Sequence, residues 1–408
     1  MDSFINRFFK GDAIIWSVIV LLAIVSAIEV YSSTGTLAFK YQDGNTSYYI
    51  LKHASFLLMG FGVIWAVHNV HYKIFSYFAT IALGISIVLL IITLFKGENI
   101  NGASRWLKIP FIGISFQPSE VAKLALIIYS AKILSKEQGE DSNPKKAFKH
   151  IMIATGTVCG LIAFQDLSTT VLIGGIIMTL MFIGRIPLKY LLGTVGSGLA
   201  LIIVIMLIAP HFEDVKTFNR VNTWKQRLET YFNAEEVSSD SSYQSDQAKI
   251  AVSTGGLLGK FFGNSRQSHY LPHPYSDYIY AIIVEEGGFF IGIFIIFLYL
   301  TLLYRAIYTA RRCKATFPVF LICGLSIALV LQAFSHIFVC IGIFPVTGQT
   351  LPFVSMGGTS ILLTSLSLGM ILSVTQYGIP PKDIQPAKEY EPNEEINEYA
   401  IQNSYSEQ

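Results

Sequence analysis

The chain has 408 residues, of which 52% are hydrophobic and 14% are charged. Soluble globular proteins carry about 25% charged residues, so this chain has too few charges to cover a water-exposed surface. Its formal net charge of +2 says little by itself, because the placement of charge matters more than its sum in a membrane protein. No nucleic-acid partner is expected. The four cysteines lie in or beside apolar blocks without CxxC spacing, which indicates neither a disulfide framework nor a zinc site.

The apolar residues fall in blocks of about 20, the length that an α-helix needs to cross roughly 30 Å of hydrocarbon. We therefore predict an all-α, polytopic integral membrane protein with about ten transmembrane helices. The first block follows "MDSFINRFFKGD" without a small-residue cleavage site, which indicates an uncleaved anchor. The predicted spans cover residues 13–34, 48–69, 74–95, 117–135, 147–165, 168–185, 187–209, 277–307, 317–343 and 357–376.

The basic residues outside these spans fall on one side of the membrane. An even number of spans places both termini on that same side, and the positive-inside rule makes it cytoplasmic. Residues 1–376 are therefore expected to form the transmembrane domain, and residues 377–408 an acidic, disordered cytoplasmic tail. The basic residues that decide the side are Arg7, Lys10, Lys73, Lys136, Lys145, Lys146, Lys149, Arg185, Lys189, Arg305, Arg311, Arg312 and Lys314.

The connection between the seventh and eighth spans, residues 210–276, is long and polar, whereas most other connections are short. A long loop of this kind is typical of functional segments, so the chemistry is expected to face outward. Its cations could be solvated surface charges, or together they could bind a phosphate-bearing ligand. They are Lys216, Arg220, Lys225, Arg227, Lys249, Lys260 and Arg266.

The loop ends in "HYLPHPYSDYIYAIIVEEGG". Pro272 and Pro274 exclude a regular helix before Asp277, so Ser276 or Asp277 is expected to begin the eighth span. Both residue types favour the N-cap position, and from the residues alone Asp277 could be a helix cap or a functional carboxylate. The prolines also break the four-residue spacing of the preceding histidines with Asp277, so no metal site is predicted.

Two adjacent glutamates, Glu285 and Glu286, follow roughly 12–13.5 Å further along the helix axis. Carboxylates at that depth are costly and usually face a polar cavity or a basic partner. Adjacent helix residues point about 100° apart, so at most one of the two is expected to face a given cavity. A structural pair with a lysine is the alternative.

Polar residues also gather around the start of the fourth span, in "NGASRWLKIPFIGISFQPSEVAK", residues 101–123. Arg105 and Trp106 are placed in an outer loop, where tryptophan suits the membrane interface. Pro118, Ser119 and Glu120 form a helix-start signature. Glu120 and Lys123 are three residues apart, which favours a structural ion pair on one helix face.

The segment "FPVTGQTLPFVSMGGTS", residues 344–360, is rich in proline and glycine and lies between the last two spans. Irregular backbone at membrane depth is tolerated only where it is buried in protein or lines a cavity. This segment therefore predicts an outward-facing pocket.

Five blocks in the same order resemble the SEDS family, the bacterial shape, elongation, division and sporulation proteins. Two of them, "YLPHPYSDYIYAIIVEEGG" and "PVTGQTLPFVSMGGTS", resemble the division members more than the elongation members. The other three are "GASRWLKIPFIGISFQPSEVAKLALI", "QDLSTT" and "YQSDQAKIAVSTGGLLGKFFGNS".

The resemblance implies a peptidoglycan glycosyltransferase that polymerises lipid II at the outer face of the bacterial cytoplasmic membrane, at the division septum. It maps the catalytic aspartate of the family to Asp277. It implies a class B penicillin-binding protein and other divisome proteins as partners. The resemblance implies no particular cofactor, and a divalent cation, Mg²⁺ or Mn²⁺, could neutralise the leaving pyrophosphate. The substrate-binding residues expected on this basis are Arg105, Trp106, Gln117, Ser119, Glu120, Lys123, Arg220, Gln244, Lys249, Arg266, Ser276, Glu286, Thr347 and Ser355.

A lipid II flippase is the alternative function, since many spans, intramembrane carboxylates and a re-entrant segment also suit transport. Transport requires polar residues that line both halves of the membrane. Here most charged candidates gather on the outer side, which favours the enzyme.

Overall fold

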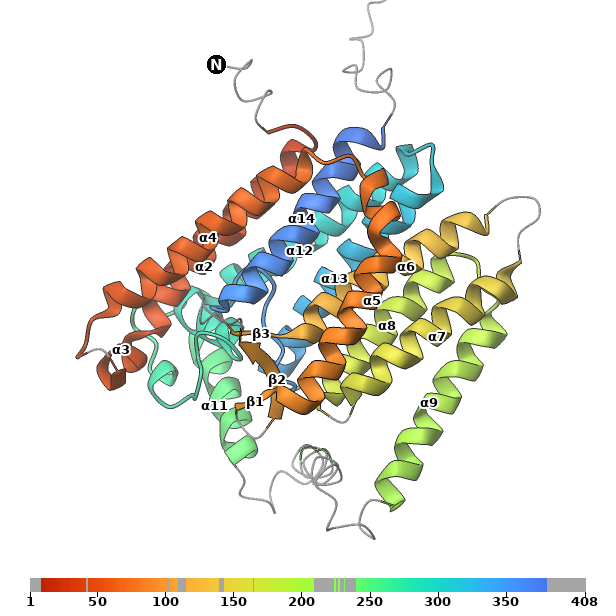
Figure 1. Cartoon of the computed structure of the whole chain (residues 1–408). Helices are drawn as coiled ribbons and strands as arrows, with labels where there is room; N and C mark the ends of the chain where they lie inside the picture. The colour runs from red at the N-terminus through yellow and green to blue at the C-terminus, as the bar shows by residue number, and fades with distance from the viewer. Residues whose placement is uncertain are drawn as a thin grey trace, which may run out of the picture.

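The computed structural model describes residues 9–41, 43–100, 103–108, 115–138, 143–163, 165–208, 224, 227, 231 and 240–379. A helix coincides with each of the ten predicted apolar segments (Figure 1). These helices are α2 (Ala13–Ser33), α4 (Thr46–His68), α5 (Lys73–Lys96), α6 (Pro118–Lys136), α7 (Pro144–Ala163), α8 (Leu167–Ile183), α9 (Leu188–Ile208), α12 (Ile279–Arg312), α13 (Thr316–Cys340) and α14 (Gly358–Tyr377).

Within the described residues, seven of these helices are long and apolar enough to span a membrane. The other three, α6, α7 and α8, are more polar or shorter: α6 carries a glutamate and three lysines, and α8 has 17 residues. The chain is therefore a multi-pass membrane protein. The number of crossings and the side of the termini stay predictions.

The helices form one bundle in which α13 is the most buried of the seven spanning helices and α9 the least. In Figure 1, α9 lies at the edge of the bundle and α13 at its centre, between α6 and α12. Their apolar surfaces explain the difference: α13 buries residues around its whole circumference, whereas α9 leaves most of its aliphatic side chains exposed. The candidate site is built around the end of α13 and the chain that follows it.

Several short elements in the connections are not anticipated by the sequence. A three-stranded antiparallel sheet precedes α6, with strands β1 (Glu98–Ile100), β2 (Ala103–Lys108) and β3 (Ser115–Phe116) in that order. The outer loop holds the helix α11 (Asp240–Gly255) and the 3₁₀ turn η2 (Gln267–His269), and α3 (Gly35–Tyr41) follows α2. The second half of the long connection predicted at 210–276 therefore contains helical structure.

Helix α12 is interrupted at Gly288, whose φ of 74° lies in the left-handed region that glycine tolerates. The end of α11 packs against this break so closely that a Cβ on Gly259 would lie 2.1 Å from the carbonyl oxygen of Glu286. Backbone bonds cross the contact: Lys260 N–H donates to the Glu285 carbonyl at 3.0 Å, and Phe289 N–H to the Gly256 carbonyl at 3.0 Å. The loop thus supplies backbone partners that the interrupted helix lacks.

The start of α12 corrects the sequence expectation. The helix begins at Ile279 with Tyr278 as its N-cap residue, and no side chain caps it. The backbone N–H groups of Ser276 and Asp277 instead both donate to the His273 carbonyl at 3.1 Å, in a turn where His273 has a φ of 57°. Asp277 is therefore not a helix cap, because proline and the left-handed His273 fold the chain into a turn first.

Candidate active site

The turn that carries Asp277 is fastened to the irregular segment between α13 and α14. Met356 N–H donates to the Tyr275 carbonyl at 2.9 Å, and Ser355 Oγ donates to the Ser276 carbonyl at 2.8 Å. Ser355 also accepts a bond from Leu351 N–H at 2.8 Å. Two predicted site residues, Ser276 and Ser355, thus lie together and hold the turn in place.

Asp277 is half-buried, and one carboxylate oxygen accepts a bond from Ser276 Oγ at 3.0 Å. The next residue, Tyr278, is buried, and its hydroxyl donates to Gln244 of α11 at 3.5 Å. Burial raises the pKa of Tyr278, and the nearby Cys340 and Asp277 act in the same direction. Tyr278 is therefore a neutral hydrogen-bonding group beside the carboxylate.

Arg227 approaches Asp277 from the outer loop. Its guanidinium donates to the Val346 carbonyl at 2.9 Å. Burial lowers the pKa of Arg227, and the guanidinium of Arg105 lowers it further. Asp166 and Asp277 oppose this shift because carboxylates stabilise the charged form. The guanidinium of Arg227 thus lies within electrostatic range of Asp277, and that of Arg105 within range of Arg227.

Arg105 on β2 forms an ion pair with Asp166 at 2.5 Å. The other oxygen of Asp166 accepts the Thr169 N–H at 3.0 Å and caps α8. One carboxylate thus fixes both a helix start and the direction of the arginine. Trp106, the next residue on β2, is half-buried.

The predicted pair at the start of α6 is confirmed: Lys123 Nζ lies 2.6 Å from Glu120 Oε2. Lys123 also donates to Gln332 of α13 at 2.7 Å, and Gln332 donates to the Thr350 carbonyl at 3.1 Å. The pair therefore links α6 and α13 to the segment that holds the Asp277 turn.

Two hydroxyls near these groups have no partner among the described residues. They are the buried Oγ of Ser119 and the buried Oγ1 of Thr347, both predicted to bind substrate. A buried hydroxyl without a partner is uncommon in a folded protein, and such atoms are free to bond a ligand. Gln117 is the half-buried N-cap residue of α6 and makes no side-chain cap bond.

His336 and Gln349 extend the same network. His336 Nδ1 donates to the Gln349 carbonyl at 2.7 Å, and Gln349 Nε2 donates to Thr169 Oγ1 at 2.7 Å. Tyr280 N–H donates to His336 Nε2 at 3.5 Å. The start of α12 is thereby connected to α13 and α8.

Sequence reasoning did not include several of these residues among the site residues. Asp166 carries a usable signal, since it lies in the "QDLSTT" block. Gln332 and His336 lie in an apolar run and give no signal beyond a polar side chain within a span. The remaining two, Arg227 and Gln349, belong to segments already identified as functional.

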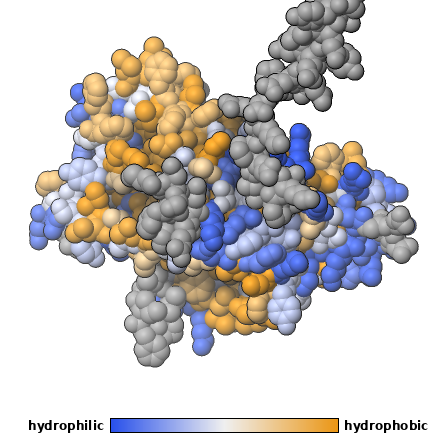
Figure 2. Space-filling model, turned by 90° about the horizontal axis from the view of Figure 1, so that it is seen from above, coloured by the Kyte–Doolittle hydropathy of each residue, from blue (hydrophilic) through white to orange (hydrophobic). Residues whose placement is uncertain are grey.

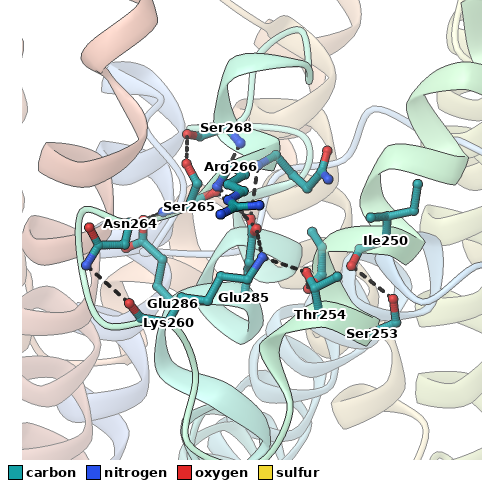
Figure 3. A network of polar contacts seen from close by, with 12 residues as sticks. Ile250, Ser253, Thr254, Lys260, Asn264, Ser265, Arg266, Ser268, Glu285 and Glu286 are labelled. Carbon is teal, nitrogen blue, oxygen red and sulfur yellow. Dashed lines mark hydrogen bonds and ion pairs between the residues drawn. The ribbon is translucent and has the colours of Figure 1, made fainter.

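Glu285 and Glu286 lie apart from this group, in a second network with residues 260–268 (Figure 3). Glu285 is fully buried and accepts bonds from Lys260 Nζ at 2.7 Å and Ser265 Oγ at 2.5 Å. The N–H groups of Arg266 and Gln267 also donate to it, each at 3.2 Å. This arrangement is the structural pair with lysine that the sequence left as the alternative.

Glu286 accepts bonds from the N–H groups of Gly263 and Ser265, both at 3.1 Å, and from the hydroxyl of Ser32 on α2. Both glutamates therefore contact the same loop, although they point in different directions around the helix. Residues 260–268 wrap around the helix and reach both side chains. Glu286 holds this loop, and the structure does not bring it together with Asp277.

The remaining predicted cations lie on the surface or outside the described residues. Arg266 is exposed, and Lys249 is exposed beside an exposed Asp246 at 3.3 Å. Arg220 lies outside the described residues. The described residues hold no group of three or more His, Cys, Asp or Glu side chains that could bind a metal ion.

A family model described as cell cycle protein, the FtsW/RodA/SpoVE model, matches residues 12–378. The chain belongs to this family. It is 33% identical over 376 residues to stage V sporulation protein E of Bacillus subtilis, and the match covers 90% of this chain and 97% of that protein. It is 29% identical over 375 residues to the probable peptidoglycan glycosyltransferase FtsW of Trichlorobacter lovleyi, and this match covers 90% of this chain and 94% of that protein.

A solved structure with the same fold comes from a study of how a peptidoglycan synthase complex coordinates polymerization and crosslinking. Its TM-score is 0.67 at 22% identity, and the match covers 90% of this chain and 98% of the other. This likeness supports the arrangement of helices described above.

Proposed function

We propose that this protein is a peptidoglycan glycosyltransferase that polymerises lipid II into β-1,4 glycan strands at the outer face of the bacterial cytoplasmic membrane. The observation that carries the proposal is the position of Asp277. It is a half-buried carboxylate at the mouth of α12 that caps no helix; Arg227 lies within electrostatic range of it, and Arg105 within range of Arg227. The names of the relatives support the same activity.

In this mechanism Asp277 is the general base. A sugar hydroxyl is a poor nucleophile at neutral pH, so a positioned carboxylate that accepts its proton accelerates the attack. Asp277 accepts a side-chain bond from Ser276 and retains acceptor capacity for a substrate hydroxyl. A single displacement at the anomeric carbon inverts its configuration and converts an α-linked donor into a β-linked product.

The leaving group in this reaction is a pyrophosphate, which needs positive charge and no proton. Arg105 and Arg227 are proposed to stabilise it as charge develops, since planar guanidinium groups bind phosphate oxygens in pairs. The described residues contain no ready metal-binding cluster. A divalent cation such as Mg²⁺ or Mn²⁺ could add positive charge at the leaving pyrophosphate.

We propose that a class B penicillin-binding protein crosslinks the product, and that the protein works at the division septum with other divisome proteins. The relatives named FtsW and the fold shared with a component of a peptidoglycan synthase complex support this assignment. Its chemistry fits as well: a polymerase that releases strands outside the membrane needs an enzyme that joins them on the same side.

The test uses purified full-length protein with lipid II, with and without the penicillin-binding protein. Wild type should produce a glycan ladder, and Asp277→Asn should lose it while keeping its thermal stability. Asp246→Asn is the matched control, because Asp246 is an exposed carboxylate on α11. Normal polymerisation by Asp277→Asn would refute the base assignment, and lipid II movement between leaflets without polymer would favour a flippase.

A further inference from the structure

A cavity lies at the opposite end of α12 from Asp277. It is an open cavity of about 430 Å³ between the start of α5, the last turns of α6 and the connection between α12 and α13. Lys73 and Lys132 supply its positive charge, and Tyr72, Ser76, Tyr77 and Phe317 line the rest. Neither the proposed reaction nor the groups around Asp277 use these residues.

The charge of this cavity is uncompensated within the part of the chain that the structure describes. None of its described lining residues is acidic, and neither lysine forms an ion pair there. Lys132 Nζ makes a single long bond, to Thr80 Oγ1 at 3.3 Å. Lys136 follows Lys132 by one helical turn and lies on the same face. The cavity therefore favours an anion.

The cavity also opens toward the lipid-facing surface. Tyr77 is 73% exposed, and Ile74, Phe78 and Ile81 on the same helix are exposed apolar side chains. Such side chains on a spanning helix face acyl chains. Seen from above, hydrophilic residues form a band across the molecule with hydrophobic patches directly beside it (Figure 2). The exposed Tyr77 lines the cavity together with the two lysines, so positive charge and lipid-facing surface meet there.

The side of the membrane follows from the predicted topology. Lys73 and Lys132 lie at the end of the bundle that carries the excess of lysine and arginine, which the positive-inside rule assigns to the cytoplasm. Basic pockets between spanning helices on that side bind anionic lipid headgroups. We propose that this cavity binds the phosphate headgroup of an anionic phospholipid of the cytoplasmic leaflet, with its acyl chains along α5.

In this arrangement the two lysines contact the phosphate oxygens, and the Ser76 hydroxyl is available as a further donor. The rings of Tyr72 and Phe317 contact the glycerol and the upper acyl chain. A free phosphate would use the lysines equally well but gain nothing from the apolar lining. This difference separates a lipid from a soluble anion.

The test measures lipid binding by native mass spectrometry of the full chain in neutral detergent, with phosphatidylglycerol and phosphatidylcholine as probes. Wild type should bind phosphatidylglycerol at least tenfold more tightly than phosphatidylcholine. The double variant Lys73→Gln/Lys132→Gln should lose about thirty-fold in affinity for phosphatidylglycerol, as expected for two lysines near a lipid phosphate. The double variant Lys145→Gln/Lys146→Gln removes the same charge from exposed positions at the same membrane side and should bind as wild type does.

Three results would overturn the proposal. Equal loss in both double variants would mean that surface charge alone attracts the lipid. Equal binding of phosphatidylcholine would remove the role of the anionic headgroup. Displacement of the lipid by millimolar inorganic phosphate would indicate a site for a soluble anion. The variant Lys73→Arg/Lys132→Arg, which keeps the charge, should retain phosphatidylglycerol and shows that any loss is not a folding defect.

Discussion

Two buried glutamates should respond differently to replacement by glutamine. Glu285 and Glu29 are both fully buried in spanning helices. Glu285 accepts four hydrogen bonds, two on each oxygen, whereas both oxygens of Glu29 are without a partner among the described residues. Replacement by glutamine keeps the shape of the side chain and exchanges one acceptor oxygen for an NH₂ donor.

In Glu285→Gln, the NH₂ group faces two donors whichever way the amide is turned. Two bonds to a charged acceptor are lost, and each is worth about 1.5–3 kcal/mol, so the expected loss of stability is about 3–6 kcal/mol. In Glu29→Gln no bond is lost, and an unpaired carboxylate would be costly at this depth. That variant should be as stable as wild type or slightly more stable.

The assay is thermal unfolding of the detergent-purified protein at a fixed scan rate, because unfolding of such a protein is governed by rate. Glu285→Gln should lower the midpoint by roughly 5–10 °C, scaling the usual shift per kcal/mol to a longer chain. Glu29→Gln should leave it within about 1–2 °C on the same scale. Equal shifts in the two variants would refute the argument that the bonds to residues 260–268 determine the difference.

Three further substitutions follow from the same geometry. Asp166→Asn should reduce polymerisation in the glycan-ladder assay at least tenfold by releasing Arg105, and unchanged activity would contradict the role of this pair. Gly259→Ala places a Cβ 2.1 Å from a backbone carbonyl at a φ of 76° and should lower the unfolding midpoint more than Gly263→Ala, which has open space at its Cβ. Arg227→Gln should lower kcat for polymerisation with little change in the unfolding midpoint, and an unaltered kcat would exclude a role in stabilising the leaving pyrophosphate.

The spanning helices could be predicted because their apolar runs are as long as the membrane requires, whatever their neighbours are. The positions of all ten helices were predicted in this way, and so was the pair of Glu120 and Lys123, whose spacing places them on one helix face. Both features depend on interactions close in sequence. The family resemblance then mapped the catalytic aspartate to Asp277. From local patterns alone, this residue could equally have been a helix cap.

The remainder of the site depends on contacts between distant segments, which no local pattern reports. Asp166 and Arg105 are 61 residues apart and meet only in the folded protein. Likewise, the break at Gly288 looks like an ordinary glycine in an apolar run until the end of α11 packs against it. The strands β1 and β3, of three and two residues, are too brief to show an alternating pattern.

The hydrogen bonds of the three carboxylates at the outer end of α12 distinguish the two structural glutamates from the proposed catalytic aspartate. The buried Glu285 and Glu286 are saturated by donors from residues 260–268, so the protein itself uses their charge to hold the loop. Asp277 is half-buried with one side-chain donor, and its turn is fixed through backbone atoms of Tyr275 and Ser276. Asp277→Asn therefore removes no bond that holds the fold, and its unfolding midpoint should match wild type even when polymerisation is lost. A fall of the midpoint comparable to that of Glu285→Gln would place Asp277 among the structural carboxylates and contradict its assignment as the base.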